Sequence, residues 1–250
     1  MRRRCRAMDE ESPTNTIAER VDALRTRIAM LERRYGRPPG SVMLLAIGKT
    51  HSVERIRAAH GAGLSQFGES YVQEATAKIG LLAGLPLSWH FVGRIQANKT
   101  AAIARSFSWV HGIDRLRIAK RLNEQRPASL PPLECCIEVN LSGEGSKGGV
   151  SPEQLSGLAT AVAALPRLRL RGLMTLPEPS RGLERQRRPF ARLARCLAEL
   201  QQQIAGLDTL SMGMSEDMEA AIAEGATIVR IGTALFGPRA PKSHQEEGLE

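Results

Sequence analysis

The chain has 250 residues, of which 42% are hydrophobic and 4% aromatic, and its formal net charge is +9. The apolar content is sufficient for a sizeable core and excludes a globally disordered chain, while no run reaches the ~18 apolar residues of a membrane-spanning helix. The basic charge permits nucleic-acid binding, but acidic residues are interleaved with the arginines and no aromatic-basic pattern accompanies them. We therefore expect solvated arginine-rich faces, with neither a nucleic acid nor a membrane as partner.

Two further features bear on the cellular compartment. The basic segment 1–6 is followed by acidic residues 9–11, where a secretory signal would have an apolar stretch. Cys5, Cys135, Cys136 and Cys196 have neither metal-binding nor redox spacing. We therefore expect no metal site and a cytoplasmic protein in a reducing compartment. The sequence leaves open whether translation starts at Met1 or Met8.

Helix-like and strand-like segments alternate along the chain. An amphipathic helix is predicted over residues 17–35, with Thr14 or Asn15 as its cap. Alternation of strands with helices indicates a parallel sheet, and eight strands is the number that closes an α/β barrel. The predicted strands are 42–47, 64–67, 88–92, 109–113, 133–140, 168–174, 209–212 and 227–231. The predicted helices are 53–62, 71–82, 97–105, 115–124, 152–165, 183–205 and 218–224, with a final helical turn at 234–236.

We therefore predict one α/β domain, a single (β/α)8 TIM-like barrel with an extra N-terminal helix. The barrel is assigned to residues 14–239, between flexible extensions at 1–13 and 240–250. An open doubly wound sheet is the alternative, but the first strand is not followed by the GxGxxG pattern of its common nucleotide-binding form. The glycine-rich loop at 142–149 is interpreted either as a cover for a site or as a mobile linker.

Lys49 stands directly after the buried-strand pattern of residues 42–47 and the flexible Gly48. Barrels and open sheets place their chemistry at the ends of strands. A lysine amine has an ordinary pKa of about 10.4, but partial burial or a nearby cation favours its neutral form. A neutral amine can condense with an aldehyde such as pyridoxal phosphate. From its position alone, Lys49 is better explained as an ordinary surface lysine, and only the rest of the chain favours the chemical role.

Polar residues at the ends of the last two strands suggest a phosphate site. Ser215 is placed to cap the helix that follows it, and Gly232 and Thr233 introduce the final helical turn. Amides at two helix starts, together with the two hydroxyls, would hold a dianion. Barrels often bind phosphate after strands seven and eight. Ordinary helix capping without a ligand is the alternative.

The remaining candidate residues carry less information. His90 and His111 are interpreted as either satisfied core residues or surface residues, and their spacing suits no metal motif. The pair Met212 and Met214, taken by itself, is interpreted as packing.

Several longer motifs occur in order along the chain: AIGKT (46–50), FGESYVQE (67–74), WHFVGRIQANK (89–99), the segment 140–149, RGLM (171–174), SMGMSEDMEAA (211–221) and VRIGT (229–233). Together they resemble the pyridoxal phosphate homeostasis protein family, the YggS/PROSC-like group related to the barrel domain of alanine racemase. The resemblance runs from about residue 17 to residue 239.

The resemblance implies a barrel that binds pyridoxal 5'-phosphate as a Schiff base on Lys49. It implies that Arg230 faces the pyridine nitrogen and that the segments after strands seven and eight hold the phosphate. No residue is implied to be catalytic. The implied cofactor-binding residues are Lys49, Ser70, Asn140, Met212, Ser215, Arg230, Gly232 and Thr233.

The implied function is intracellular pyridoxal phosphate homeostasis, in which a monomer buffers the reactive aldehyde and delivers it to apo-enzymes without robust catalysis. Because an arginine keeps its proton, Arg230 would leave the pyridine nitrogen unprotonated and the ring a weaker electron sink. The second domain that completes racemase sites is expected to be absent. A pyridoxal phosphate-dependent amino-acid racemase or related enzyme is the alternative. The chain departs from the family at Gly48, usually serine, at Ser70, usually asparagine, and at Arg94, often proline.

Overall fold

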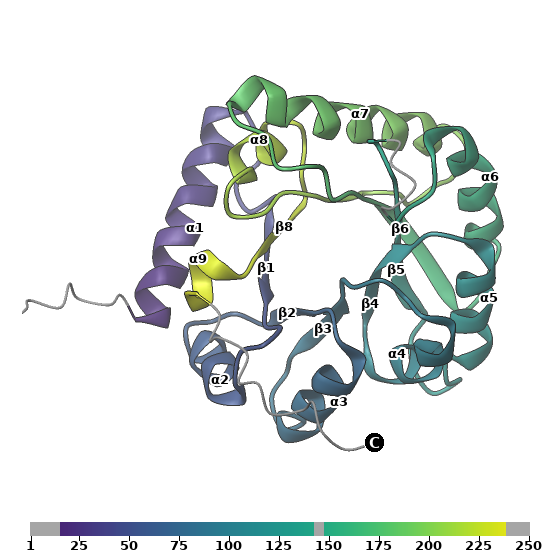
Figure 1. Ribbon diagram of the computed structural model, residues 1–250, viewed down its shortest axis with the longest axis horizontal. Helices are drawn as coiled ribbons and strands as arrows, with labels where there is room; N and C mark the ends of the chain where they lie inside the picture. The colour runs from purple at the N-terminus through teal and green to yellow at the C-terminus, as the bar shows by residue number, and fades with distance from the viewer. Residues whose placement is uncertain (1–15, 143–147, 239–250) are drawn as a thin grey trace, which may run out of the picture.

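The computed structural model describes residues 16–142 and 148–238, which form a closed barrel of eight parallel strands (Figure 1). Strands that follow one another in the chain pair with each other, and β1 completes the ring by pairing with β8. The predicted single (β/α)8 barrel is thereby confirmed. The strands are β1 (Met43–Ile47), β2 (Gln66–Glu69), β3 (Ser88–Phe91), β4 (Trp109–Ile113), β5 (Leu133–Glu138), β6 (Leu168–Met174), β7 (Thr209–Ser211) and β8 (Ile228–Ile231).

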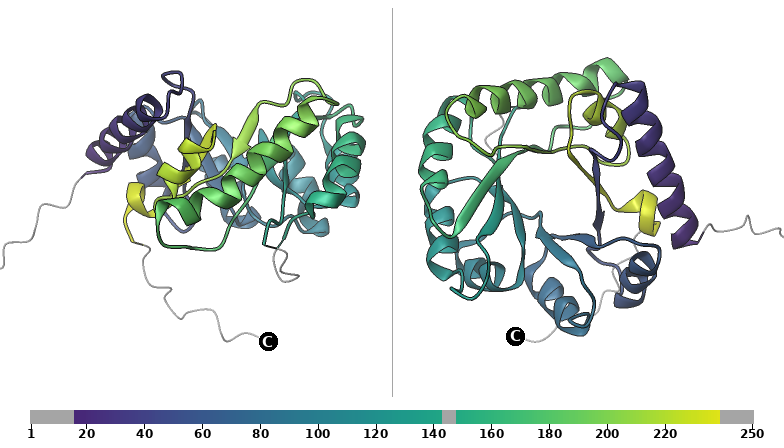
Figure 2. Two further views of the ribbon diagram at one scale, coloured as in Figure 1. Left: turned by 90° about the horizontal axis from the view of Figure 1, so that it is seen from above. Right: turned by 180° about the vertical axis from the view of Figure 1, so that it is seen from behind.

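Helices surround the strands, as the side and rear views show (Figure 2). Because both faces of each strand are covered, the strands are rich in buried apolar residues. None of the helices in the described ranges is long and apolar enough to cross a membrane. The helices are α1 (Ile17–Arg34), α2 (Val53–Gly61), α3 (Val72–Leu81), η1 (Ala97–Lys99), α4 (Thr100–Ser106), α5 (Leu116–Gln125), α6 (Pro152–Ala163), α7 (Leu183–Gln201), α8 (Met218–Ala223) and α9 (Thr233–Phe236).

The extra helix α1 begins at a capping box formed by Thr16 and Glu19. The Thr16 hydroxyl accepts the Glu19 N–H at 3.2 Å, and the Glu19 carboxylate accepts the Thr16 N–H at 2.8 Å. The predicted cap was therefore wrong, and Thr14 and Asn15 lie outside the described residues, as do the predicted flexible ends 1–13 and 240–250. α1 lies across the point where the barrel closes, beside α2, α8 and α9 (Figure 1).

Two strands differ from the prediction by two residues, and the others agree to within one residue at each end. β2 lies two residues later than expected, because the prediction followed apolar residues and could not place the buried carboxylate of Glu69 at the end of a strand. β5 ends at Glu138 rather than at Asn140, since beyond it Val139 makes only an isolated bridge with Val150. The central residues 143–147 of the glycine-rich loop lie outside the described residues.

The motif at 171–174 forms an irregularity in β6, near the end of the barrel where the strands begin. Cys135 pairs with Leu170, whereas the next residue, Cys136, pairs with Gly172, so Arg171 is an extra residue in its strand. Such a bulge bends the strand and redirects the side chain of the extra residue. We call this end of the barrel the amino end, and the opposite end the mouth.

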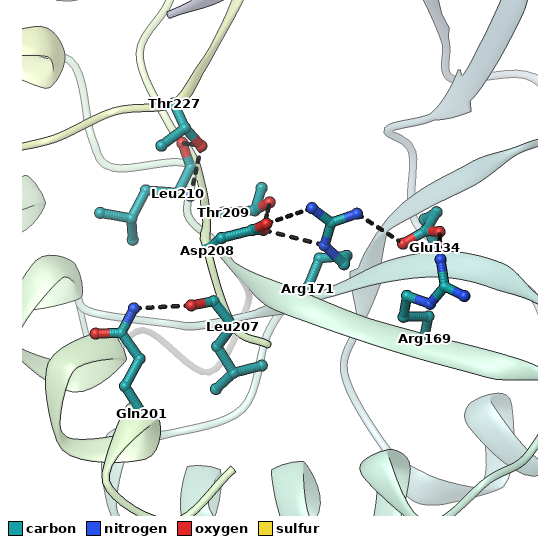
Figure 3. A network of polar contacts seen from close by, with 9 residues as sticks. All are labelled: Glu134, Arg169, Arg171, Gln201, Leu207, Asp208, Thr209, Leu210 and Thr227. Carbon is teal, nitrogen blue, oxygen red and sulfur yellow. Dashed lines mark hydrogen bonds and ion pairs between the residues drawn. The ribbon is translucent and has the colours of Figure 1, made fainter. Parts of the chain in front are cut away.

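Arg171 uses this position to join two strands of the amino end (Figure 3). Its guanidinium binds the Asp208 carboxylate and lies 3.2 Å from Glu134. Beside it, a Cβ atom built on Gly172 would lie 1.9 Å from the carbonyl oxygen of Thr209. Only glycine permits this approach of β6 to β7, so the glycine of the motif is explained by the packing of these two strands.

Candidate cofactor-binding site

A cavity of ≈ 560 Å³ opens at the mouth of the barrel, where the strands end. Its walls come mainly from the segments that follow β1, β2, β6, β7 and β8. The lining residues are Ile47, Lys49, His51, Ser70, Val92, Leu176, Pro177, Pro179, Ser180, Gln186, Met214, Ser215, Glu216, Asp217, Arg230, Gly232, Thr233 and Ala234.

The cavity brings together six of the eight candidate residues: Lys49, Ser70, Ser215, Arg230, Gly232 and Thr233. Asn140 instead lines a neighbouring cavity of ≈ 390 Å³, which shares part of its wall with the first. Met212 lines neither of these two cavities, because its side chain is fully buried in the apolar core. This burial agrees with the interpretation of Met212 as a packing residue rather than with a direct cofactor contact.

Lys49 is the second residue of a tight turn that directly follows β1. The His51 N–H donates to the Gly48 carbonyl at 3.0 Å, and Thr50, the third residue of the turn, has a φ of 66°. A positive φ at this position is typical of a type II turn and normally belongs to glycine or asparagine. The turn places the half-buried Lys49 side chain at the wall of the cavity.

Arg230 supplies a buried positive charge from β8. Its guanidinium donates to the Ser211 hydroxyl and to the Thr175 carbonyl, each at 2.9 Å, and to the Ser211 carbonyl. Burial lowers the pKa of Arg230 to about 10, while the carboxylates of Asp217 and Glu138 oppose the shift. The side chain therefore stays protonated at neutral pH and can only donate hydrogen bonds.

Two histidines that the sequence left undecided form a buried polar chain behind Arg230. His90 Nε2 lies 2.8 Å from Gln66 Oε1, His90 Nδ1 lies 2.9 Å from His111 Nε2, and His111 Nδ1 lies 2.7 Å from Ser211 Oγ. Because an amide oxygen only accepts, His90 Nε2 must donate to Gln66, and each neutral ring then accepts from the next member. The chain thus runs in one direction, from Arg230 through Ser211 and the two rings to Gln66.

Both rings of this chain are neutral. Burial lowers the pKa of His90 to about 3, and burial, His90 and Arg230 lower the pKa of His111 well below its ordinary value. His90 also stacks on Trp109, with ring centroids 5.4 Å apart. Strand alternation could have indicated that both histidines point into the barrel, but nothing in the sequence reveals that they meet.

The turn after β7 differs from the expected helix cap. Asp217, not Ser215, occupies the N-cap position of α8, and its carboxylate accepts the Met214 N–H at 2.6 Å. Ser215 lies in the turn before the helix and lines the cavity. Gly213, with a φ of 92°, lets this turn pack against α8, since a Cβ there would lie 2.5 Å from the Ala221 methyl group.

The turn after β8 does form the expected helical start. Gly232 is the N-cap of α9 and Thr233 its first residue. The first amides of a helix have no partner within the helix, so this segment offers N–H groups and one hydroxyl at the cavity wall. His51, which the sequence did not single out, faces the same cavity and lies 4.8 Å from the Phe236 ring.

Comparison with known proteins identifies the family. The model of the alanine racemase N-terminal domain matches residues 20–240. The chain is 57% identical over 225 residues to the pyridoxal phosphate homeostasis protein of Pseudomonas aeruginosa, covering 90% of this chain and 96% of that protein. It is 50% identical over 228 residues to the protein of the same name from Escherichia coli K12, covering 90% and 97%. The chain belongs to the pyridoxal phosphate homeostasis protein family.

Solved structures agree with this assignment. PipY of Synechococcus elongatus PCC7942, determined with pyridoxal phosphate bound, is 37% identical and matches with a TM-score of 0.79 over 89% of this chain and 100% of its own. Alanine racemase from Corynebacterium glutamicum matches with a TM-score of 0.64 at 19% identity, over 92% of this chain and 64% of that one. The second likeness concerns the barrel fold alone.

Proposed function

We propose that this protein binds pyridoxal 5'-phosphate in the cavity at the mouth, holds it covalently on Lys49, and acts in intracellular pyridoxal phosphate homeostasis. The observation that carries the proposal is that one cavity contains a primary amine, a buried arginine and the hydroxyls of Ser215 and Thr233. Family membership supports it, as does the presence of pyridoxal phosphate in the PipY structure.

The chemistry of these groups fits the three parts of this cofactor. Lys49 would take the aldehyde carbon. Arg230 would donate to the pyridine nitrogen, and Ser215, Thr233 and the first amides of α9 would hold the phosphate. Asn140, in the adjoining cavity, is retained as an outer contact, whereas the buried Met212 would support the turn from behind.

Lys49 would hold the cofactor covalently, because its neutral amine could condense with the aldehyde carbon and the carbonyl oxygen would leave as water with the two protons of the amine. When bound, the cofactor supplies a reactive carbonyl and an aromatic ring that can accept electrons. The protein's part is to shelter both and to present them at an open mouth.

The nature of Arg230 supports a carrier rather than an enzyme. A protonated guanidinium cannot transfer a proton to the pyridine nitrogen at neutral pH, so the ring would remain a weak electron sink. His111 and His90 are neutral and sequestered behind Arg230, where they would support that donor. We therefore propose a cytoplasmic monomer that stores the aldehyde and passes it to apo-enzymes, with at most sluggish side reactions.

The proposal is tested by incubating the protein with pyridoxal phosphate and recording its visible spectrum. Reduction with borohydride should then add the cofactor's mass to the intact protein, and peptide mapping should place that mass on Lys49. Lys49→Ala should lose the absorption band, whereas Lys120→Ala, on the exposed surface of α5, should keep it.

Two results would contradict the proposal. A colourless wild-type protein would exclude covalent binding. Turnover of free amino acids at roughly 1 per second or faster, the ordinary scale of enzymes, would favour the racemase alternative over a carrier.

A further inference from the structure

A buried ionic cluster lies directly behind the Lys49 turn, outside the cavity. Lys78, from α3, places its ammonium 2.9 Å from Glu69 Oε1 at the end of β2 and 2.5 Å from Glu74 Oε1 on its own helix. The Lys78 and Glu69 side chains are 8% and 0% exposed. Buried charges are retained in proteins only where close partners compensate for lost hydration, so the location of this cluster needs an explanation.

The cluster binds the backbone on both sides of Lys49. The Lys78 ammonium donates to the Gly48 carbonyl at 2.7 Å, and the Glu74 carboxylate accepts the Thr50 N–H at 2.6 Å. The Gly48 N–H in turn donates to the Gly68 carbonyl at 2.9 Å, which ties the start of the turn to β2. The peptide groups on both sides of Lys49 are therefore held by charged side chains.

The turn needs this support because of Thr50. Its φ of 66° is the only positive value among the non-glycine residues that the structure describes. A β-branched residue rarely adopts this region, since its Cβ substituents crowd the backbone. A charge-assisted hydrogen bond from the Thr50 N–H to Glu74 favours the strained conformation over relaxed ones.

Glu69 couples the cluster to Gly48. A Cβ atom on Gly48 would lie 2.9 Å from Glu69 Oε1, so glycine makes room for the carboxylate. The second oxygen, Oε2, is buried and has no hydrogen-bond partner among residues 16–142 and 148–238. Burial raises the pKa of Glu69 to about 7 against the opposing effect of Lys78, which shows how much this arrangement departs from a relaxed surface pair.

We propose that Lys78, Glu69 and Glu74 are positioning residues that fix the Lys49 turn and thereby aim the lysine amine into the cavity. The inference rests on the proposed function and deepens it, because it assigns a role to the motif FGESYVQE, whose two glutamates lie outside the cavity. Lys78 follows Glu74 by one helical turn, so α3 supplies both the cation and one carboxylate.

The first test uses the cofactor-free protein and amide hydrogen exchange at Thr50. Glu74→Ala removes the acceptor and should speed exchange of the Thr50 amide about tenfold, since local opening becomes easier. Glu74→Gln keeps a carbonyl oxygen at the same reach and should restore exchange to within about twofold of wild type. Glu184→Ala, at the exposed start of α7, is the matched control and should leave the rate unchanged.

The second test measures the release of pyridoxal phosphate from loaded protein into an excess of a trapping hydrazine. Release should be about fivefold to tenfold faster from Glu74→Ala than from wild type and should return nearly to the wild-type rate in Glu74→Gln, corresponding to about 1 kcal/mol. Glu74→Asp keeps the charge but shortens the side chain, so its release rate should also be about fivefold to tenfold faster than that of wild type. This second variant provides the test if Glu74→Ala folds poorly.

The outcomes separate the two proposals. Failure of the wild-type protein to take up the cofactor would overturn the proposed function. The exchange measurement would still test whether the ionic cluster fixes the Lys49 turn. Unchanged Thr50 exchange and unchanged release in both Glu74→Ala and Glu74→Asp would overturn the positioning role.

Discussion

At each end of the barrel a cation lies between two carboxylates, and the two arrangements differ in their exposure to solvent. At the amino end, Arg171 bridges Glu134 and Asp208, with side chains that are 28%, 17% and 54% exposed. Behind the mouth, Lys78 bridges the fully buried Glu69 and the partly buried Glu74. One cation with two carboxylates is therefore partly exposed to solvent at the amino end and largely buried behind the mouth.

The partners of the two cations differ as well. Arg171 joins side chains from neighbouring strands, whereas Lys78 also binds the backbone carbonyl that precedes Lys49. Exposed pairs contribute little because water screens them, but a buried cluster is costly to disturb. Partly exposed ion pairs thus join strands at the amino end, whereas backbone strain and buried charge lie beside the candidate amine, as they commonly do at functional sites.

The largest effect is expected from Gly172→Ala at the amino end. The added methyl group would lie 1.9 Å from the Thr209 carbonyl oxygen, so β6 and β7 must separate. We expect the free energy of unfolding to fall by about 4 kcal/mol, measured by urea denaturation. The fraction that remains folded should still bind pyridoxal phosphate, and a variant as stable as wild type would show that the close approach is unimportant.

A pH-dependent effect is expected from Glu69→Gln behind the mouth. Because the folded-state pKa of Glu69 is raised from 4.5 to about 7, the folded protein holds this proton more tightly than the unfolded chain. The stability that the Glu69 side chain contributes is therefore fully present below pH 4.5. It is lost as the pH rises to about 7, and the free energy of unfolding falls by about 3 kcal/mol over this range.

Glutamine is neutral throughout this range, so the free energy of unfolding of the Glu69→Gln variant does not show this decrease with rising pH. Its free energy of unfolding relative to wild type should therefore rise by about 3 kcal/mol between pH 4 and pH 8, as measured by urea denaturation at several pH values. A constant difference between the two proteins would mean that the pKa of Glu69 is the same in the folded protein and in the unfolded chain, which would contradict the raised pKa.

The smallest effect is expected from Arg171→Met. Methionine keeps an apolar side chain but loses both ion pairs and the guanidinium that lies 5.5 Å from the centre of the Trp109 ring. We expect a loss of about 1 kcal/mol at low salt, shrinking as ionic strength rises because partly exposed charges are screened. A loss that is large and insensitive to salt would contradict the view that this end depends on weak, solvated pairs.

How far the sequence predicts this molecule depends on the range of each interaction. Alternating strand and helix patterns revealed the barrel, and the barrel in turn predicted that Lys49, Arg230 and Thr233 would meet, because all strand ends converge on one mouth. Nothing in the sequence shows that Glu69 and Lys78 form a pair, since local patterns do not report which polar residues are buried together.

Two details of the segment after β7 have the same origin. The resemblance implies that Met212 contacts the cofactor, and this stays a prediction, but the burial of Met212 in the apolar core could not be foreseen from the motif. The expected capping role of Ser215 went instead to Asp217, because the turn runs two residues further before α8 begins. Such details are decided by tertiary packing rather than by residue preference.

The pairing of β1 with β8 has a consequence for biosynthesis. Lys49 is synthesised long before residues 228–236, yet this later segment supplies Arg230, Gly232 and Thr233 to the same cavity. The carbonyl of Phe236 is then held by Arg55 at 2.7 Å, which fastens α9 to α2. A chain that ends before β8 therefore carries Lys49 without Arg230, Gly232 and Thr233, which belong to the same cavity in the folded protein.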